Sequence, residues 1–377
     1  MTRYRLAIRP LTAVHIGCGE SLTPLEYTFR KNKQGEDIFV RFRPETLVQG
    51  LNKEKKALFS SLAAGKDILA LRKFLAENLS YDSILYTARV TSEFLKEFAV
   101  RSESEANSLE IEAEYRPAGQ KFPVLPGSSI KGAFRTAILN QRIKKKRIKG
   151  GEFSLDPRSR YDTDLQRWGL DFGVPNDDPF RAISIGDCPF PPQDNQLISR
   201  MLQYKPNRQG VGSFDSISIH AEVIAGELSG GSAQGVTDFL IVEELENFRA
   251  LEYGALKFKA HRKILDTPIS SQELLDSCDS FYGKAFDDEF NKFFLNAPDD
   301  SLYRSAQNLA DLVDSLKSSN EHLVRIGRWS HVESVTLEDP FRRPFGRRGY
   351  GKTRTLLEYE GAYFPMGWCA FRLEKED

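Results

Sequence analysis

Alternating apolar and polar residues predict the strands of this chain. At the N-terminus the apolar residues Tyr4, Leu6 and Ile8 stand at every second position, with arginines at 3, 5 and 9, a period of two that is typical of a half-buried strand. The same pattern, or a short apolar run, predicts further strands at 25–29, 38–42, 182–185, 217–223, 239–242, 356–359 and 367–373.

Apolar residues at helical spacing predict the helices. The clearest helix follows the turn Leu125-Pro126-Gly127-Ser128, where Ile130, Ala133, Phe134, Ala137 and Ile138 form one predicted buried stripe and Ser128 is the expected N-cap. Further helices are predicted at 44–80, at 92–102 and in the acidic stretch 270–318, whereas 150–178, rich in Gly, Pro and Asp, is predicted to be a long loop.

Strand and helix segments mixed in two halves indicate an α+β protein. The Gly-, Pro- and Asn-rich stretch near 204–213 suggests a boundary between domains at 1–205 and 206–377. The first domain would carry a helical insertion near 44–105. The second would carry the acidic helices near 270–318 and end in a Gly- and Arg-rich tail.

Composition limits the kinds of site to expect. Fifty-three basic and 53 acidic residues give a formal net charge of zero, which argues against a uniformly basic nucleic-acid binder but allows a local basic stripe. The four cysteines and five histidines lack metal-ligand spacing. We therefore expect no metal, no cofactor, reduced thiols and a cytoplasmic protein without a membrane span.

The residues Gly346–Thr353 match the phosphate-loop pattern G-x-x-x-x-G-K-T. Two prolines stand in the preceding segment 339–344, which does not suit a central strand, and an apparent strand follows the pattern instead of a helix. A nucleotide-binding loop is therefore the least favoured interpretation. Its glycine amides and nearby Arg347, Arg348, Lys352 and Arg354 still suit the phosphates of a polymer.

Two other clusters of residues could bind nucleic acid. Lys131 and Arg135 share a face near the start of the central helix, where free amides and cations favour phosphate; a solvated lysine on an ordinary helix is an equal alternative. In the tail, Arg325 and Arg328 precede an aromatic residue, Trp329, and His331 follows it, a mixture that suits single-stranded nucleic acid. The alternative is a surface network with Glu333 and Glu338.

Three separated motifs carry a family resemblance. They are Thr12–Gly19, the stretch from Leu125 to Arg135, and the tail with Arg325-Ile326-Gly327 and Gly351–Leu356. Together they resemble the RAMP superfamily of CRISPR proteins, and most of all its branch that supplies the fifth subunit of the type III-A Csm effector complex. The resemblance implies two ferredoxin-like (RRM-related) domains and a glycine-rich loop near the C-terminus.

The resemblance also implies a function. It predicts a non-catalytic, guide-RNA-binding subunit that caps the backbone of the complex near the 3′ end of the guide, contacts neighbouring Csm subunits and supports guide maturation by recruiting host nucleases. Carried onto this sequence, His15, Gly17, Lys131 and Arg135 would face RNA or the next subunit. Gly349, Gly351, Lys352 and Arg354 would form the loop.

One rival function comes from another class. A RAMP endoribonuclease would cut guide precursors without metal, with His15 or Tyr350 as acid or base. The sequence alone shows no carboxylate or second histidine placed to complete such a pair.

Overall fold

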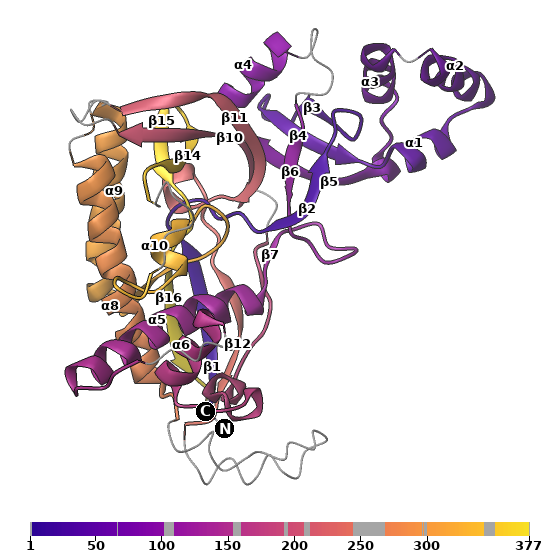
Figure 1. Cartoon of the computed structure of the whole chain (residues 1–377). Coiled ribbons are helices and arrows are strands. Elements are labelled where there is room, and N and C mark those ends of the chain that lie inside the picture. The colour runs from indigo at the N-terminus through magenta and orange to yellow at the C-terminus, as the bar shows by residue number, and fades with distance from the viewer. Residues whose placement is uncertain are drawn as a thin grey trace.

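The computed structural model describes residues 2–65, 67–101, 109–153, 160–191, 195–206, 212–243, 268–295, 297, 300–342 and 351–376. Within these ranges the strands form two main sheets, and helices pack against both (Figure 1). The fold is α+β, as the sequence predicts. A short third sheet pairs β7 (Val124–Leu125) with β9 (Cys188–Pro189).

The smaller main sheet has five strands in the order β13-β16-β1-β12-β8. All neighbours run antiparallel. The strands are β1 (Thr2–Pro10), β8 (Ile183–Ile185), β12 (Gly235–Ile241), β13 (His322–Arg325) and β16 (Trp368–Lys375). Because β1 pairs with β16, the first and last strands lie side by side at the centre of the sheet, and both chain ends emerge together (Figure 1).

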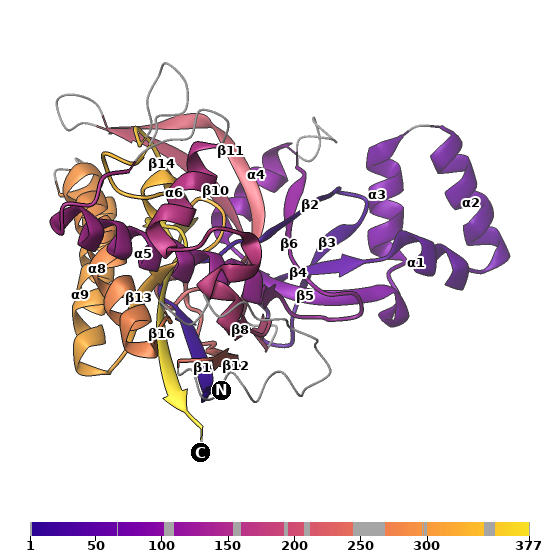
Figure 2. The same ribbon diagram turned by 60° about the horizontal axis from the view of Figure 1, so that its bottom comes forward.

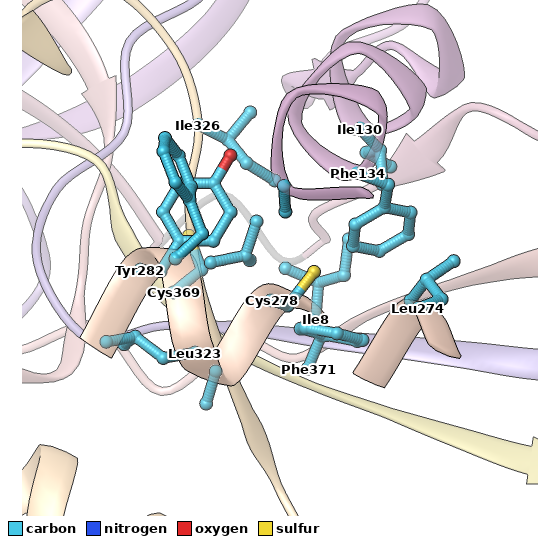
Figure 3. Packing of buried hydrophobic residues seen from close by; sticks show 14 of the residues in the cluster. Ile8, Ile130, Phe134, Leu274, Cys278, Tyr282, Leu323, Ile326, Cys369 and Phe371 are labelled. Atoms are coloured by element: carbon cyan, nitrogen blue, oxygen red, sulfur yellow. The ribbon is translucent and has the colours of Figure 1, made fainter. Parts of the chain in front are cut away.

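Two long helices cover one face of this sheet, α5 (Gly127–Ile148) and α8 (Ser271–Glu289). Their buried residues mix with those of the strands in the largest core (Figure 3). Ile130 and Phe134 of α5 meet Leu274 of α8 and Phe371 of β16 there, and all four are completely buried. This core fixes both helices to the sheet, since burial of each large apolar side chain contributes about 1.5–3 kcal/mol.

The larger sheet follows the order β2-β6-β11-β10-β5-β4-β3, and β14 pairs with β10 and β15. Its long β10–β11 hairpin arches over one end of the molecule (Figures 1 and 2). The strands are β2 (Gly17–Leu22), β3 (Tyr27–Lys31), β4 (Asp37–Phe42), β5 (Ile84–Val90), β6 (Ile111–Glu114), β10 (Gln196–Pro206), β11 (Gly212–Ile224), β14 (Arg354–Tyr359) and β15 (Ala362–Pro365).

A helical arm is inserted between β4 and β5. It consists of α1 (Pro44–Gly50), α2 (Lys53–Ala64), α3 (Ile68–Glu77) and the short turn η1 (Tyr81–Ser83). The arm projects from the body on the side away from α8 and has its own small core, which includes Phe42, Leu47 and Leu75 (Figures 1 and 2). None of the residues of α2 is buried.

The remaining helices fill the surface of the body. They are α4 (Ser92–Arg101), α6 (Tyr161–Leu170), η2 (Pro175–Asp177), η3 (Pro179–Ala182), η5 (Glu227–Ser229), the π-helical turn η8 (Phe290–Phe294), α9 (Asp300–Ser315), η9 (Leu316–Ser318) and α10 (His331–Val335). The predicted helices at 44–80, 92–102 and 270–318 thus correspond to α1–α3, α4 and α8–α9.

Three sequence-based expectations need correction. The central helix begins at Gly127, with Pro126 at the N-cap position and no side-chain cap, so Ser128 lies inside the first turn. The stretch 150–178 is not one loop, because α6 occupies Tyr161–Leu170. The division after residue 205 falls near the end of β10, inside the β10–β11 hairpin, and each main sheet takes strands from both sides of it.

Candidate nucleic-acid interface

The structure distributes the sequence-predicted residues over three places. His15, Gly17, Arg328 and Trp329 come together where β2 and β6 meet the segment between β13 and α10. Lys131 and Arg135 lie on α5, and Arg325 and Arg354 meet at Glu289 beside Gly351 and Lys352. Arg347, Arg348 and Gly349 lie outside the described residues.

His15 is completely buried between two strands of the larger sheet. Its Nδ1 lies 2.7 Å from the carbonyl oxygen of Glu222 and 3.2 Å from Oε2 of Glu114, and its Nε2 lies 3.8 Å from Oε2 of Glu112. The carbonyl can only accept, so the short contact places a proton on Nδ1. His15 is therefore a core histidine with two carboxylates beside it.

The carboxylates determine the charge of His15. Burial lowers the pKa of the imidazole, but the hydrogen bond and charge of Glu114, the Glu222 carbonyl and the charge of Glu112 raise it, and the net pKa lies above 6.5. Burial in turn raises the pKa of Glu114. The sequence could not reveal these partners, since Glu112 and Glu114 lie about a hundred positions further along the chain.

Trp329 lies on the imidazole and Arg328 lies on Trp329. The His15 and Trp329 ring centroids are 4.9 Å apart, and the Arg328 guanidinium lies 4.8 Å from the Trp329 ring. Arg328 also forms an ion pair with Glu112 and keeps 48% of its side chain exposed. We call these three side chains, His15, Trp329 and Arg328, the His15 stack.

The backbone that carries the stack adopts an uncommon conformation. Gly327, Trp329 and His331 have φ values of +95°, +63° and +58°, of which the two non-glycine residues each cost about 1–3 kcal/mol. A Cβ at residue 327 would lie 2.7 Å from the carbonyl oxygen of His15, the same oxygen that accepts a hydrogen bond from the Arg328 amide at 2.8 Å. This close approach explains the glycine of the Arg-Ile-Gly motif.

The second cluster, the Glu289 cluster, is a buried ionic group of Glu289, Arg325, Arg354 and Trp368. One carboxylate oxygen of Glu289 accepts hydrogen bonds from Arg325, at 3.0 Å, and from Arg354, and the other accepts from the Trp368 indole at 2.9 Å. Both guanidinium groups are at most 2% exposed, and Arg325 lies 4.5 Å from the Trp368 ring. These contacts join α8 to the strands of the C-terminal segment.

Electrostatics explain the ionisation of this cluster. Burial alone would raise the pKa of Glu289, but the charges of Arg325 and Arg354 lower it to about 2. Burial and the same two cations lower the pKa of His331 to about 3, so its ring is neutral. Nε2 of His331 accepts a hydrogen bond from the Thr355 amide at 3.2 Å.

The glycine-rich pattern leads into a strand. Arg354, directly after Thr353, begins β14, so the helix that a nucleotide-binding phosphate loop requires does not follow. Gly351 has a φ of +65°, its carbonyl accepts from Lys292, and a Cβ there would collide with the Glu333 carboxylate. Lys352 is exposed.

Lys131 and Arg135, the two candidate cations of α5, are held by intramolecular contacts. Lys131 Nζ donates to the Ile183 carbonyl at 2.6 Å, and burial lowers its pKa. Arg135 pairs with Asp178 at 2.8 Å and donates to Gln166. On the same helix, a Cβ at Gly132 would meet no neighbouring atom of the described residues within 4 Å, so the packing there does not require a glycine.

Two features that the described residues lack bear on other functions. No group of three or more His, Cys, Asp and Glu side chains in these ranges could hold a metal ion. No helix among them has both the length and the apolar character needed to cross a bilayer.

Comparison with known families decides which family this is. The model of the RAMP superfamily matches residues 7–352. The chain belongs to the RAMP superfamily. The match covers the residues of all three motifs as far as Lys352.

One curated relative is a protein of a CRISPR system. The "CRISPR system Cms protein Csm5" of Streptococcus thermophilus is 26% identical over 196 residues, which cover 52% of this chain and 53% of that protein. The match thus spans about half the length of that curated relative.

Solved RAMP structures share the fold. A chain in the cryo-EM structure of a Csm–crRNA–target RNA ternary complex of a type III-A CRISPR–Cas system aligns over 100% of both chains, with a TM-score of 0.63 and 20% identity. The crystal structure of T. onnurineus Csm5 aligns over 96% of this chain and 99% of the other, with a TM-score of 0.52 and 18% identity. The RAMP chain is therefore Csm5-like.

Proposed function

We propose that this chain is a guide-RNA-binding subunit of a type III-A CRISPR effector complex and has no active site of its own. The observation that carries the proposal is the full-length fold match to a chain of the Csm–crRNA–target RNA complex. The local sequence relationship to Csm5 supports it independently. Partners would be the guide RNA and neighbouring Csm subunits, in the cytoplasm.

The topology supports a ferredoxin-like domain, although not with the predicted bounds. In chain order β1, α5, β8, β12, α8 and β16 form a strand–helix–strand–strand–helix–strand unit, interrupted by β2–β7 after β1, by β9–β11 after β8, and by α9 and further strands after α8. Its strands have the spatial order β16-β1-β12-β8, antiparallel throughout. This is the split βαβ arrangement, and we propose that this unit, which combines segments from both sides of residue 205, forms one RAMP domain.

Exposure divides the candidate residues into two roles. Arg328 and Lys352 are exposed and suit direct contact with phosphates. Arg325 and Arg354 are buried, so we assign them the role of holding the glycine-rich segment in place. Lys131 and Arg135 stay candidates for a subunit or RNA contact. Arg347, Arg348 and Gly349 stay in the proposed loop on sequence grounds.

The position in the complex is part of the proposal. A capping subunit near the 3′ end of the guide would present one face to the backbone and another to nucleases that trim the guide. The acidic helices α8 and α9, with exposed Asp287 and Asp288, offer a protein-binding surface for the second task.

The endoribonuclease alternative gains no support from the site. A general acid or base must reach the ribose hydroxyl or the leaving oxygen, and the His15 side chain is 0% exposed. Tyr350, the other candidate, lies outside the described residues.

Reconstitution of the effector complex with and without this chain tests the proposal. We expect the chain to co-purify with the complex and guide RNA, and omission to leave the bound guides with longer, untrimmed 3′ ends in RNA sequencing. A chain that binds neither RNA nor the complex would contradict the proposal. Metal-independent cleavage of precursor RNA that His15→Ala abolishes would favour the enzyme.

A further inference from the structure

We propose that Trp329 is a stacking platform for an unpaired RNA base, and that Arg328 covers it in the free protein and moves to an RNA phosphate on binding. This inference deepens the proposed RNA-binding function and rests on it. The geometry of the His15 stack carries it, together with the position of Glu112.

The first step is the fixed position of the Trp329 ring. One face lies on the buried His15 imidazole, with centroids 4.9 Å apart. The backbone is held by the Arg328 amide, which donates to the His15 carbonyl at 2.8 Å, and by Ser330 Oγ, which donates to the Gly327 carbonyl at 2.7 Å. A ring held in this way loses little conformational entropy when a base stacks on it.

Second, the group that lies over the Trp329 ring is a weakly held cation. Trp329 also carries the Arg328 guanidinium, 4.8 Å away, on a side chain that is 48% exposed. Exposed cation–π contacts and exposed ion pairs are both weak. Arg328 can therefore leave the ring at small cost, while the ring itself stays in place.

Third, an RNA phosphate can replace the Glu112 carboxylate as the partner of Arg328. In the free protein Arg328 pairs with the Glu112 carboxylate; with RNA it would pair with a phosphate, which guanidinium binds in the same forked geometry. The cation–π contact is exchanged for a base–ring stack. Glu112 is left near Nε2 of His15, 3.8 Å away, and so keeps a neighbour of opposite charge when His15 is protonated.

Fourth, RNA can reach the His15 stack from the surface of the protein. Gly17, Cys18, Gly19, Glu20 and Ser21 of the adjoining edge strand β2 are all exposed, and β2 pairs with Glu112 through Ser21. A single strand can thus approach the stack over β2. The mixture of one ring and one cation suits binding of any base.

Variants of Glu112, Arg328 and Trp329 test the exchange. The full-length protein is titrated with a labelled oligouridylate, and folding of each variant is checked by thermal melting. Trp329→Leu, which keeps an apolar contact, should weaken binding between about 5- and 150-fold. Glu112→Gln should release Arg328 and tighten binding by up to about fivefold.

Two controls separate exchange from a general charge effect. Glu20→Gln removes the same charge from the neighbouring strand without freeing Arg328, so it should leave affinity nearly unchanged. In an Arg328→Gln background, Glu112→Gln should no longer tighten binding, because the two effects are coupled. With unlabelled RNA, quenching of tryptophan fluorescence should be present in the wild type and smaller in Trp329→Leu.

The outcomes distinguish this inference from the proposed function. If the wild type binds RNA but Trp329→Leu and Glu112→Gln change neither its affinity nor the quenching, Trp329 is not a stacking platform and the proposed function still stands. If these variants alter only co-purification of protein subunits, a protein segment occupies the stack and the inference fails. A wild type that binds no RNA overturns both.

Discussion

At the residue scale, one buried carboxylate organises the C-terminal segment. Glu289 is 2% exposed and is the common partner of Arg325, Arg354 and the Trp368 indole. Replacing all members of a buried ionic group by apolar residues is often neutral, but removing one partner leaves the others buried and unpaired. Removing Glu289 should destabilise the fold more than removing either arginine, since two buried cations would remain without their carboxylate.

We predict that Glu289→Gln lowers the free energy of unfolding by about 3–5 kcal/mol. The amide keeps the shape of the side chain but cannot balance Arg325 and Arg354. Urea unfolding followed by circular dichroism measures the change. Asp288→Asn is the matched control. It removes the charge of the preceding residue, whose side chain is exposed, and should change the free energy of unfolding by less than about 0.5 kcal/mol. Equal effects would show that the cluster stabilises nothing.

The same variant should change how stability depends on pH. Because the folded pKa of Glu289, about 2, lies below its usual 4.5, its contribution is present above pH 4.5 and is lost as the pH falls toward 2. The stability difference between wild type and Glu289→Gln should therefore shrink over this window in urea unfolding at each pH. A difference that stays constant would contradict the assigned pKa.

Sequence reasoning identifies the cations of these sites but not their anions. Arg325 and Arg328 stand close together in a basic tail, and Glu333 and Glu338 are the acids nearest in sequence after them. The structure supplies Glu289 from α8 and Glu112 from β6 instead. Such partners are fixed by tertiary packing, and nothing in the spacing of one sequence encodes them.

At the element scale, strong periodicity predicts well and weak periodicity does not. The stripe of α5 is long enough to predict a helix; Ile130, Phe134, Ala137 and Ile138 are buried as expected, and Ala133 is half-buried against the same core. In α6 the large apolar residues that are buried are only Leu165 and Leu170, and Pro, Gly and Asp residues surround the helix. Two anchors do not produce a recognisable period, so the sequence predicts a loop where the structure has a helix.

The helical arm should be dispensable for folding of the body. The Arg43 amide donates to the Ser83 carbonyl at 2.9 Å, so the arm is an insertion into a β4–β5 hairpin. We predict that replacing 44–82 by Asn-Gly, a favoured two-residue hairpin turn, with Phe42→Thr to avoid exposing a ring, costs only about 1–2 kcal/mol. Circular dichroism and thermal melting should show a cooperative transition.

A matched deletion shows whether this tolerance belongs to the arm. Removing α8, which buries eight residues including Phe281 and Tyr282, should prevent folding altogether. If the protein without its arm also aggregates or melts without a cooperative transition, the arm is part of the main core and the prediction fails.

At the scale of the whole molecule, the division at residue 205 illustrates what local composition cannot decide. Gly, Pro and Asn residues near 204–213 are equally compatible with a linker and with the end of a hairpin. The structure has β10 and β11 paired from Gln196↔Ile224 to Pro206↔Gly212. Only the long-range pairing of strands distinguishes the two cases, and it is not a property of the segment itself.

We predict that neither 1–205 nor 206–377 folds alone. The first fragment would keep β1 and β8 but lose their common neighbour β12, and the second would keep β12 and β16 without the central β1. Each fragment would also expose the edge of a strand from the β10–β11 hairpin, which invites aggregation. Size-exclusion chromatography and urea unfolding of each fragment, and of the two co-expressed, test this.

Co-expression provides the control, because both fragments together contain every strand. We expect a soluble complex with circular dichroism close to that of the intact chain, since the chain break would lie at the end of one hairpin. A fragment 1–205 that is soluble and unfolds cooperatively would establish an independent N-terminal domain. Residues of both halves would then meet at a domain interface, and the His15 stack, built from 12–17, 112–114 and 327–330, would lie across it.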